Sequence, residues 1–273
     1  LYQLLGKIRK DVIQLAVTGS ELRLKAGKSK AGLILQQEIK LPIQEIGAIG
    51  DWKKIPESLL AAMQFCMFSC SNDMSKPVLT CVHVVNSGYV ESCNNHRLTR
   101  YKLGVKLPVK SFLIPANSVN ALTGKLYKFT EIAEGDGWVH FKSDEGTVFS
   151  CRVFEDSYPS IDKILKVKGT SLTLPENTKD ILEKAGIFSK RDHFLDEIVH
   201  VRIGDGKLKI RADAETGWYE EETKIAYPTD TEIEFAINPT FLQDILTREV
   251  NCTLGSDRMK FTGPEWEHVV ALR

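Results

Sequence analysis

The residues whose types could do chemistry most directly are an adjacent histidine and arginine, His96 and Arg97, in the segment CNNHRLTRY. A histidine can act as a general base near neutral pH, and an arginine can hold an anionic group. Catalysis also needs a nucleophile or an acid held against the histidine, and the sequence names none. The alternative is a loop in which Asn94 and Asn95 adopt turn geometry. The residues alone favour the loop, and an enzyme with His96 as its base is the competing hypothesis.

Acidic clusters offer a second kind of chemistry, the binding of a metal ion. Glu155-Asp156 and Glu220-Glu221-Glu222 carry adjacent carboxylates, which are the ligands that hard cations prefer. The first pair falls in an expected turn, and the second run lies on the wet face of an expected strand. Both are therefore interpreted as solvated surface, and no metal site is expected there.

Cysteines could form a zinc site, and a glycine-rich segment could form a phosphate-binding loop. Cys66 and Cys70 stand one helical turn apart and could supply half of a zinc site. The six cysteines are scattered, no CxxC pair occurs, and the histidines do not cluster with them. Reduced core thiols in a cytoplasmic protein are favoured. Gly204-Asp205-Gly206 reads as a hairpin turn and not as a phosphate loop, so no cofactor is expected.

The elements that must position these residues follow a repeat marked by four prolines. Pro56, Pro115, Pro175 and Pro239 are spaced 59, 60 and 64 residues apart. Each follows an apolar extended stretch and precedes a helical pattern. Proline suits the first turn of a helix, because its missing N–H has no partner there and its φ is already helical. The repeat predicts four helices, of which the second is the shortest and weakest.

Alternating apolar and polar residues between the helices are broken by glycine turns. The pattern occurs in VRIGDGKLKIRAD (201–213), in residues 131–153 around Gly135 and Gly137, and in residues 12–35 around Gly19. Period-two alternation of this kind predicts antiparallel strands with one wet face.

The repeating unit is thus one helix followed by three or four antiparallel strands, in roughly 60 residues. A lone unit leaves its helix and sheet without enough apolar cover, so we expect two units to pair into a domain of about 120 residues. The chain holds five units, an odd number, and it begins with Leu1 and not with methionine. We therefore expect a half-domain to be missing at the amino end.

Composition limits the partners. The chain of 273 residues is 42% apolar and 26% charged, as in a soluble globular protein. No apolar run approaches the ~18 residues of a membrane span and no signal peptide is visible, so no membrane partner is expected. Its 36 basic and 36 acidic residues give no net charge. Local patches must therefore meet any polyanion.

Five stretches resemble, in family order, the bacterial DNA polymerase III beta subunit, the sliding clamp. They lie along the whole chain: ELRLKAGKSKAGLIL (21–35), CNNHRLTRY (93–101), FSCRVFEDSYPSIDKIL (149–165), INPTFLQDIL (237–246) and HVVALR (268–273). Each motif alone is weak, but five in the right order on the expected repeat make a strong resemblance to a divergent clamp.

The resemblance implies an α+β fold with three similar domains per subunit and two subunits closing a ring. Helices would line the hole and antiparallel sheets would form the outside. Residues 1–50 would be the second half of domain 1, residues 51–167 domain 2 and residues 168–273 domain 3. The first half of domain 1 would be absent.

The function implied by the resemblance is that of a processivity factor in DNA replication. Such a clamp is a non-catalytic subunit of a DNA-directed DNA polymerase, a nucleotidyltransferase, and it encircles duplex DNA without reading sequence. It would work as a homodimer in the bacterial cytoplasm, associated with the nucleoid and without a cofactor. Replicative polymerase, clamp loader and repair proteins would dock through short linear peptides. The alternatives are a clamp-like scaffold without ring loading, and an enzyme that uses the His96 loop.

The family's site residues can be matched to positions of this chain. Between domains 2 and 3 the resemblance implies an apolar peptide pocket formed by Leu79, Cys93, Asn95, His96, Arg97, Leu98, Asn238, Phe241, Val269, Val270 and Leu272. Basic residues near the ends of the helices would face DNA, namely Lys53, Lys54, Lys125, Lys128, Lys190, Arg191 and Arg248.

Departures from the family pattern fall on the rim of this pocket. Asn94 and Asn95 stand where clamps usually have Asp and Gly, and the tail from Val270 to Arg273 lacks the customary proline. We therefore expect a peptide preference that differs from the common one.

Overall fold

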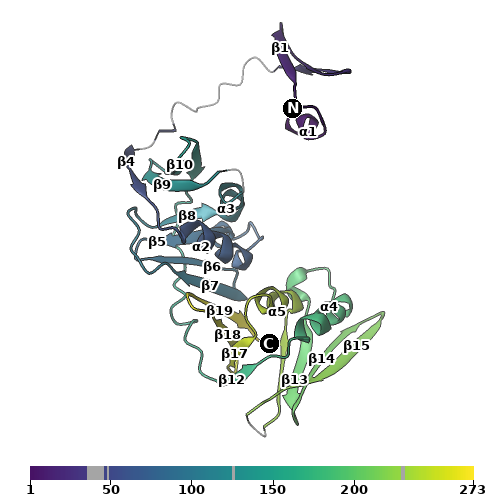
Figure 1. Ribbon diagram of the computed structural model, residues 1–273. Helices are drawn as coiled ribbons and strands as arrows, with labels where there is room; N and C mark the ends of the chain where they lie inside the picture. The colour runs from purple at the N-terminus through teal and green to yellow at the C-terminus, as the bar shows by residue number, and fades with distance from the viewer. Residues whose placement is uncertain (36–45, 48, 125–126, 229–230) are drawn as a thin grey trace. The chain divides into compact units, whose positions relative to one another are not determined.

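The structure is a computed structural model that describes residues 1–35, 46–47, 49–124, 127–228 and 231–273 (Figure 1). It divides into two compact units, Leu1–Gly47 and Ala48–Arg273, which are described separately. No helix among the described residues is long and apolar enough to cross a membrane.

The first unit is a short helix followed by a three-stranded antiparallel meander, as the glycine turns predict. It contains α1 (Tyr2–Leu5), β1 (Gln14–Thr18), β2 (Glu21–Ala26) and β3 (Ser29–Ile34), with β2 in the centre. Gly19 and Gly27 make the two turns with positive φ, where a side chain would be strained. Leu24 and Ala26 are buried, whereas Leu15 and Val17 on the edge strand remain exposed.

The described part of the second unit forms three antiparallel sheets (Figure 1). One runs in the order β11-β10-β9-β4 and consists of β4 (Ile49–Lys54), β9 (Phe129–Glu134), β10 (Trp138–Ser143) and β11 (Val148–Arg152). Another runs in the order β15-β14-β13-β16 and consists of β13 (Val199–Gly204), β14 (Lys207–Ala214), β15 (Gly217–Lys224) and β16 (Ile233–Ile237).

The third sheet is the largest and runs through the middle of this unit in the order β12-β17-β18-β19-β7-β6-β5-β8. Its strands are β5 (Cys81–Val85), β6 (Tyr89–Cys93), β7 (Arg97–Lys102), β8 (Phe112–Pro115), β12 (Thr170–Thr173), β17 (Asn251–Leu254), β18 (Arg258–Thr262) and β19 (Trp266–Ala271). Its two halves, far apart in sequence, meet where β19 pairs with β7.

All four helices predicted from the prolines are present. They are α2 (Leu59–Cys66), α3 (Ala116–Leu122), α4 (Thr178–Phe188) and α5 (Pro239–Leu246). Pro239 is the first residue of α5 and Pro115 caps α3, whereas Pro56 and Pro175 each lie two residues before the N-cap. The second helix is the shortest, as predicted.

The helices pair as the repeat predicts, because α2 contacts α3 and α4 contacts α5. Each pair belongs to its own apolar core. One core contains Leu59 and Val119 from its helices, and the other contains Ile181 and Ile245. The two cores match the predicted pairing of units, while the boundary between residues 167 and 168 stays a prediction.

Two further predictions from the sequence, a hairpin turn and buried cysteines, are confirmed. The hairpin between β13 and β14 turns at Asp205 and Gly206, both with positive φ, as the Gly-Asp-Gly run predicts. All six cysteines are buried and free of disulfides, in agreement with core thiols.

Candidate functional site

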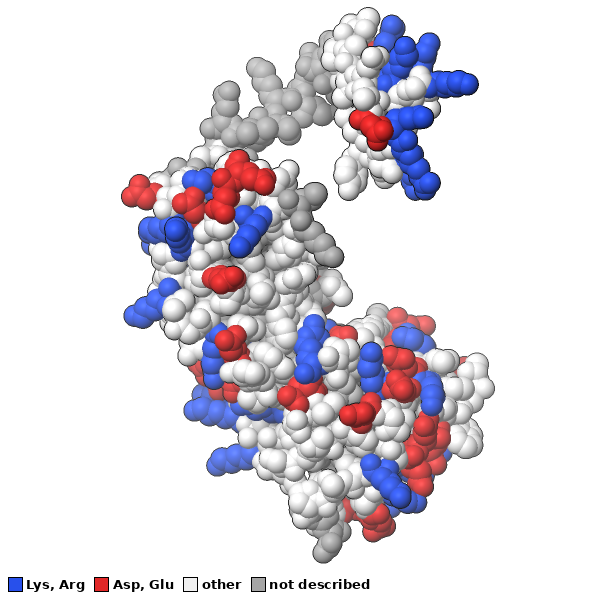
Figure 2. All heavy atoms as spheres, in the orientation of Figure 1, with Lys and Arg blue, Asp and Glu red and all other residues white. Residues whose placement is uncertain are grey.

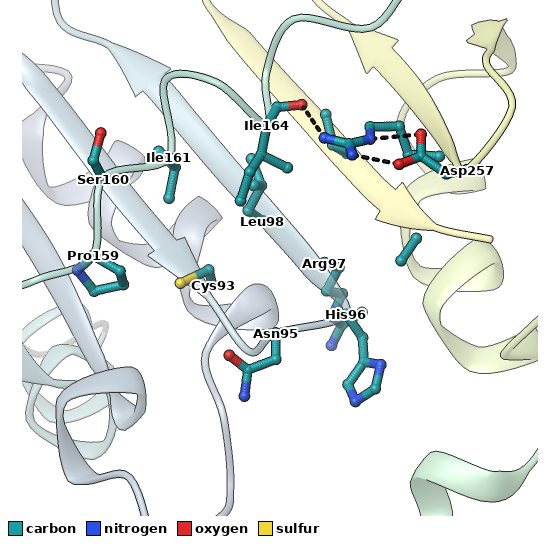
Figure 3. A pocket seen from close by; sticks show the side chains of 13 residues that line it. Cys93, Asn95, His96, Arg97, Leu98, Pro159, Ser160, Ile161, Ile164 and Asp257 are labelled. Atoms are coloured by element: carbon teal, nitrogen blue, oxygen red, sulfur yellow. Dashed lines mark hydrogen bonds and ion pairs between the residues drawn. The ribbon is translucent and has the colours of Figure 1, made fainter. Parts of the chain in front are cut away.

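A mostly apolar hollow of about 300 Å³ opens beside the junction of β7 and β19 (Figure 3). Strand residues form one side and a connecting segment forms the other. We call Cys93, Leu98, Val269 and Ala271 the strand wall, and Pro159, Ser160, Ile161 and Ile164 the loop wall. Polar groups at its edge complete the lining: Asn95, His96, Arg97, Asp257 and Arg258.

The strand wall is held by sheet hydrogen bonding. Leu98 on β7 is paired with Cys93 on β6 and with Val269 on β19. The backbone N–H of Ala271 also donates to the carbonyl oxygen of His96 at 2.7 Å. This wall is therefore part of the large sheet.

The turn between β6 and β7 has the geometry predicted for Asn94 and Asn95. The side-chain oxygen of Asn94 accepts from the N–H groups of His96 and Arg97 at 3.1 and 2.9 Å. Asn95 has a φ of 70°, in the left-handed region that asparagine tolerates. The loop interpretation is confirmed, and the turn directs His96 to the mouth of the hollow (Figure 3).

A small apolar cluster, separate from the two main cores, connects the two walls of the hollow. It contains Leu79, Cys93, Leu98, Ile161, Leu165 and Val269. The cluster thus forms one floor shared by both walls, and Leu79 packs in it without lining the hollow.

His96 and Arg97 have different surroundings. The His96 ring stacks on Phe241 at a centroid distance of 6.1 Å, and burial together with the charge of Arg273 lowers its pKa. The Arg97 guanidinium is only 9% exposed, bonds the carboxylate of Asp244 at 2.5 Å, and lies 4.5 Å from the centre of the Phe241 ring. Because its guanidinium contacts Asp244 and the Phe241 ring, Arg97 mainly holds the edge of the hollow in place.

Six of the predicted pocket residues line the hollow: Cys93, Asn95, His96, Arg97, Leu98 and Val269. Leu79 packs in the shared floor without lining the hollow, and the remaining four are also outside its lining. Asn238 caps α5, Phe241 and Val270 belong to the neighbouring core, and Leu272 packs against that core.

Sequence reasoning missed the loop wall and the Asp257–Arg258 edge. The only available signal was the segment FSCRVFEDSYPSIDKIL, which carried part of the resemblance but was not matched to the pocket. The segment lacks periodicity, so nothing in the pattern indicated which side chains point inward.

The predicted DNA-facing cations lie in mixed surroundings. Lys53 and Lys54 are on strand β4 and not at a helix end, and Lys53 donates to the carbonyl oxygen of Pro108. Lys190 pairs with Glu197, and Arg191 donates to the carbonyl oxygen of Asp213.

Arg248 and Lys128 are both exposed, but their contacts differ. The Arg248 guanidinium lies over the rings of Phe65 and Phe68 at 5.0 and 4.5 Å, and burial lowers its pKa. Lys128 is exposed just before β9. Lys125 lies outside the described residues.

Comparison with known proteins gives one consistent picture. No family model matches the chain. It is 27% identical over 240 residues to the beta sliding clamps of two Streptococcus pneumoniae strains, TIGR4 and R6, with 83% of this chain and 63% of each relative covered. The chain thus spans less than two thirds of the length of these curated relatives.

Solved structures agree on the fold. The DNA polymerase III subunit beta of Pseudomonas aeruginosa has a TM-score of 0.79 at 18% identity, covering 99% of this chain and 79% of that one. The beta chain from S. pneumoniae TIGR4 has the same TM-score at 19% identity, with 99% and 78% covered. A P. aeruginosa sliding clamp bound to griselimycin is also similar, with a TM-score of 0.77, 18% identity, and 99% and 78% covered. The resemblance drawn from the five sequence stretches is confirmed: this chain has the fold of the bacterial DNA polymerase III beta subunits and is similar in sequence to the beta sliding clamps.

Proposed function

We propose that the chain acts as a DNA sliding clamp, a non-catalytic processivity factor that tethers polymerase and other partners through short peptides. The observation that carries the proposal is the apolar hollow between the strand wall and the loop wall, at the place where the resemblance implies a docking pocket. This function needs a notch for a side chain and a ring around DNA, and it needs no catalytic group.

The chemistry of the hollow suits an apolar peptide anchor. Its floor is made of leucine, isoleucine and valine side chains, while His96, Asn95 and Arg258 offer polar groups at the edge. A volume of about 300 Å³ accommodates one or two large side chains. Anchors of this type carry most of the binding energy in small interfaces.

Contact with DNA is proposed to be weak and independent of sequence. A clamp is retained by topology, and tight phosphate contacts would oppose sliding. All six of the predicted cations that the structure describes are exposed. Lys53, Lys190, Arg191 and Arg248 already contact other groups, whereas no hydrogen bond or ion pair of Lys54 or Lys128 is found among the described residues. We expect Lys54 and Lys128 to contribute more of the salt dependence.

A homodimer ring is the proposed assembly. Strand β15 is an edge strand; its residue Trp218 is 61% exposed, and Ile187 on the contacting helix α4 is 70% exposed. Residues 1–35 carry seven basic and two acidic side chains, and Figure 2 shows blue side chains gathered on this unit. Pairing of β15, with its run of Glu220 to Glu222, against the basic meander of a second copy would cover both edges.

The competing enzyme hypothesis makes a different prediction at His96. Its ring contacts are the face of Phe241 and the charge of Arg273, and neither activates a base. Replacing His96 by Ala is expected to weaken peptide binding. No enzymatic turnover is expected in either the wild type or the variant. A substrate whose turnover disappears in this variant would favour the enzyme.

Primer extension tests the proposal. The polymerase encoded by the same genome is assayed with its loader, with and without the full chain, and product length is measured. The chain is expected to lengthen the products, and griselimycin is used as a competitor. Peptide binding without any increase in product length would instead favour a scaffold that is not loaded as a ring.

A further inference from the structure

The loop wall poses a structural question, because no helix or strand holds it. Residues 157–161 have no regular structure and residues 162–165 form a turn. Its own backbone bonds are short-range: the N–H groups of Ile164 and Leu165 both donate to the carbonyl oxygen of Ile161, at 3.0 and 3.1 Å. Contacts with neighbouring elements must therefore position the wall.

Both ends of the segment are held by side chains. At the start, the Tyr158 hydroxyl donates to Cys93 Sγ at 3.4 Å, and its ring lies 4.8 Å from that of His83. At the end, Lys260 Nζ on β18 donates to the carbonyl oxygen of Leu165 at 3.0 Å. In the middle, Ile161 is 2% exposed within the apolar cluster, and Arg258 Nη1 donates to the carbonyl oxygen of Ile164 at 3.5 Å (Figure 3). Asp162, between these two residues, adds a charged contact.

The middle is held by an ion pair between Arg100 on β7 and Asp162. Arg100 Nη2 lies 2.7 Å from Asp162 Oδ1. Arg100 is only 16% exposed and also pairs with the buried carboxylate of Glu91, while its guanidinium lies 5.0 Å from the centre of the Tyr89 ring. Glu91 and Tyr89 thus orient the arginine, and Asp162, which is 66% exposed, brings the loop to it.

The paired charges favour the ionised forms of both residues. Hydrogen bonding to Arg100 and its positive charge hold the pKa of Asp162 below its usual range. Burial acts against the charge of Arg100, but its two carboxylate partners raise its pKa overall. Neither Arg100 nor Asp162 lines the hollow, so any effect on binding must act through the position of the loop.

We propose that the Arg100–Asp162 pair is a positioning latch for the peptide pocket, which keeps Ile161 and Ile164 in place as a preformed wall. The inference rests on the proposed docking function of the hollow. A wall that is ordered before the ligand arrives removes part of the ordering entropy of binding. Releasing the latch should weaken binding without removing a ligand contact.

Asp162→Asn is the test variant, because it removes the negative charge of the latch and leaves the buried Arg100–Glu91 pair intact. Asp162→Glu keeps the carboxylate and should retain most of the affinity. Lys163→Gln is the matched control, since it changes one charge at an exposed neighbour for which no ion pair is found among the described residues.

Two measurements on the full chain separate the latch from the docking function. Amide hydrogen exchange at Ile164 and Leu165 reports the order of the free loop. Calorimetric titration with griselimycin, and with overlapping peptides of the polymerase from the same genome, reports binding. Asp162→Asn should raise exchange and weaken binding about two- to fivefold, as expected for a partly exposed ion pair. High salt should bring wild type and variant together, which a purely steric role would not do.

Unchanged exchange in Asp162→Asn would overturn the latch. Faster exchange with unchanged affinity would overturn its role in positioning the pocket. If wild type binds neither griselimycin nor any polymerase peptide, the docking function fails, and the exchange data still decide whether the latch exists.

Discussion

The two walls of the hollow are built by different means. Leu98 and Val269 on the strand wall face each other within a ladder of backbone hydrogen bonds and belong to an apolar cluster. Ile164 on the loop wall is 41% exposed, and its position depends on Arg258, which donates to its carbonyl oxygen, and on Arg100 and Lys260, which hold the neighbouring residues Asp162 and Leu165. Ile161 of the loop wall is buried in the same cluster, so the contrast rests on Ile164: the strand wall should govern stability, and Ile164 should govern ligand affinity.

The largest expected effect is on the strand wall, for Leu98→Ala. Leu98 is 3% exposed and joins β6, β7 and β19, so the change leaves a cavity in the shared floor. The free energy of unfolding should fall by about 2–4 kcal/mol in urea denaturation. A loss below about 1 kcal/mol would mean that this wall is not part of the core.

Low pH should reduce the stability of the folded chain through His268 on β19. The ring is fully buried, Nδ1 shares a 2.8 Å hydrogen bond with Thr99 Oγ1, and burial lowers its pKa well below the ordinary value. The unfolded chain therefore takes up a proton below about pH 6.5 that the folded chain refuses.

Stability should consequently fall as pH drops from about 6.5 towards the folded pKa, by up to about 1.4 kcal/mol per pH unit. Urea denaturation across this window measures the slope, and His268→Gln should flatten it. His200→Gln, at an exposed position on β13, is the matched control. Equal slopes in all three proteins would rule out His268 as the source.

A smaller loss of stability is expected from Asp244→Asn at the edge of the strand wall. The change leaves the Arg97 guanidinium, 9% exposed, without its carboxylate. Because Asp244 itself is partly exposed, the loss should be about 1 kcal/mol in urea denaturation. Asp257→Asn, which removes the exposed partner of Arg258, should leave stability unchanged. Equal effects of the two changes would contradict the role assigned to Arg97.

The smallest effect on stability is expected for Ile164→Ala on the loop wall. Its partial exposure should keep the change in unfolding free energy within about 0.5 kcal/mol. Griselimycin or peptide affinity should nevertheless fall about fivefold, because apolar contact area is lost. Destabilisation as large as that of Leu98→Ala would remove the distinction between the walls.

Much of this architecture could be predicted from local sequence signals. The four prolines locate the helices, the glycine turns locate the hairpins, and Asn94 and Asn95 mark the turn before β7. Each of these signals depends on the backbone preference of one or two residues. They were therefore sufficient without knowledge of the tertiary fold.

The loop wall and its latch could not be predicted in this way. Arg100 and Asp162 are 62 positions apart and meet only after two segments of the fold come together. Lys53 and Lys54 were expected near a helix end, but they lie on strand β4, which pairs with β9. The assignment of the pocket and DNA-facing residues therefore stays a prediction that mutagenesis must test.

The central claim is that the chain holds polymerase on DNA by encircling it. The direct measurement is retention of the full chain, placed by its loader on nicked circular DNA, before and after the circle is cut. A topological clamp should remain on the circle and leave rapidly once the DNA is linear. Equal retention on circular and linear DNA would contradict encirclement.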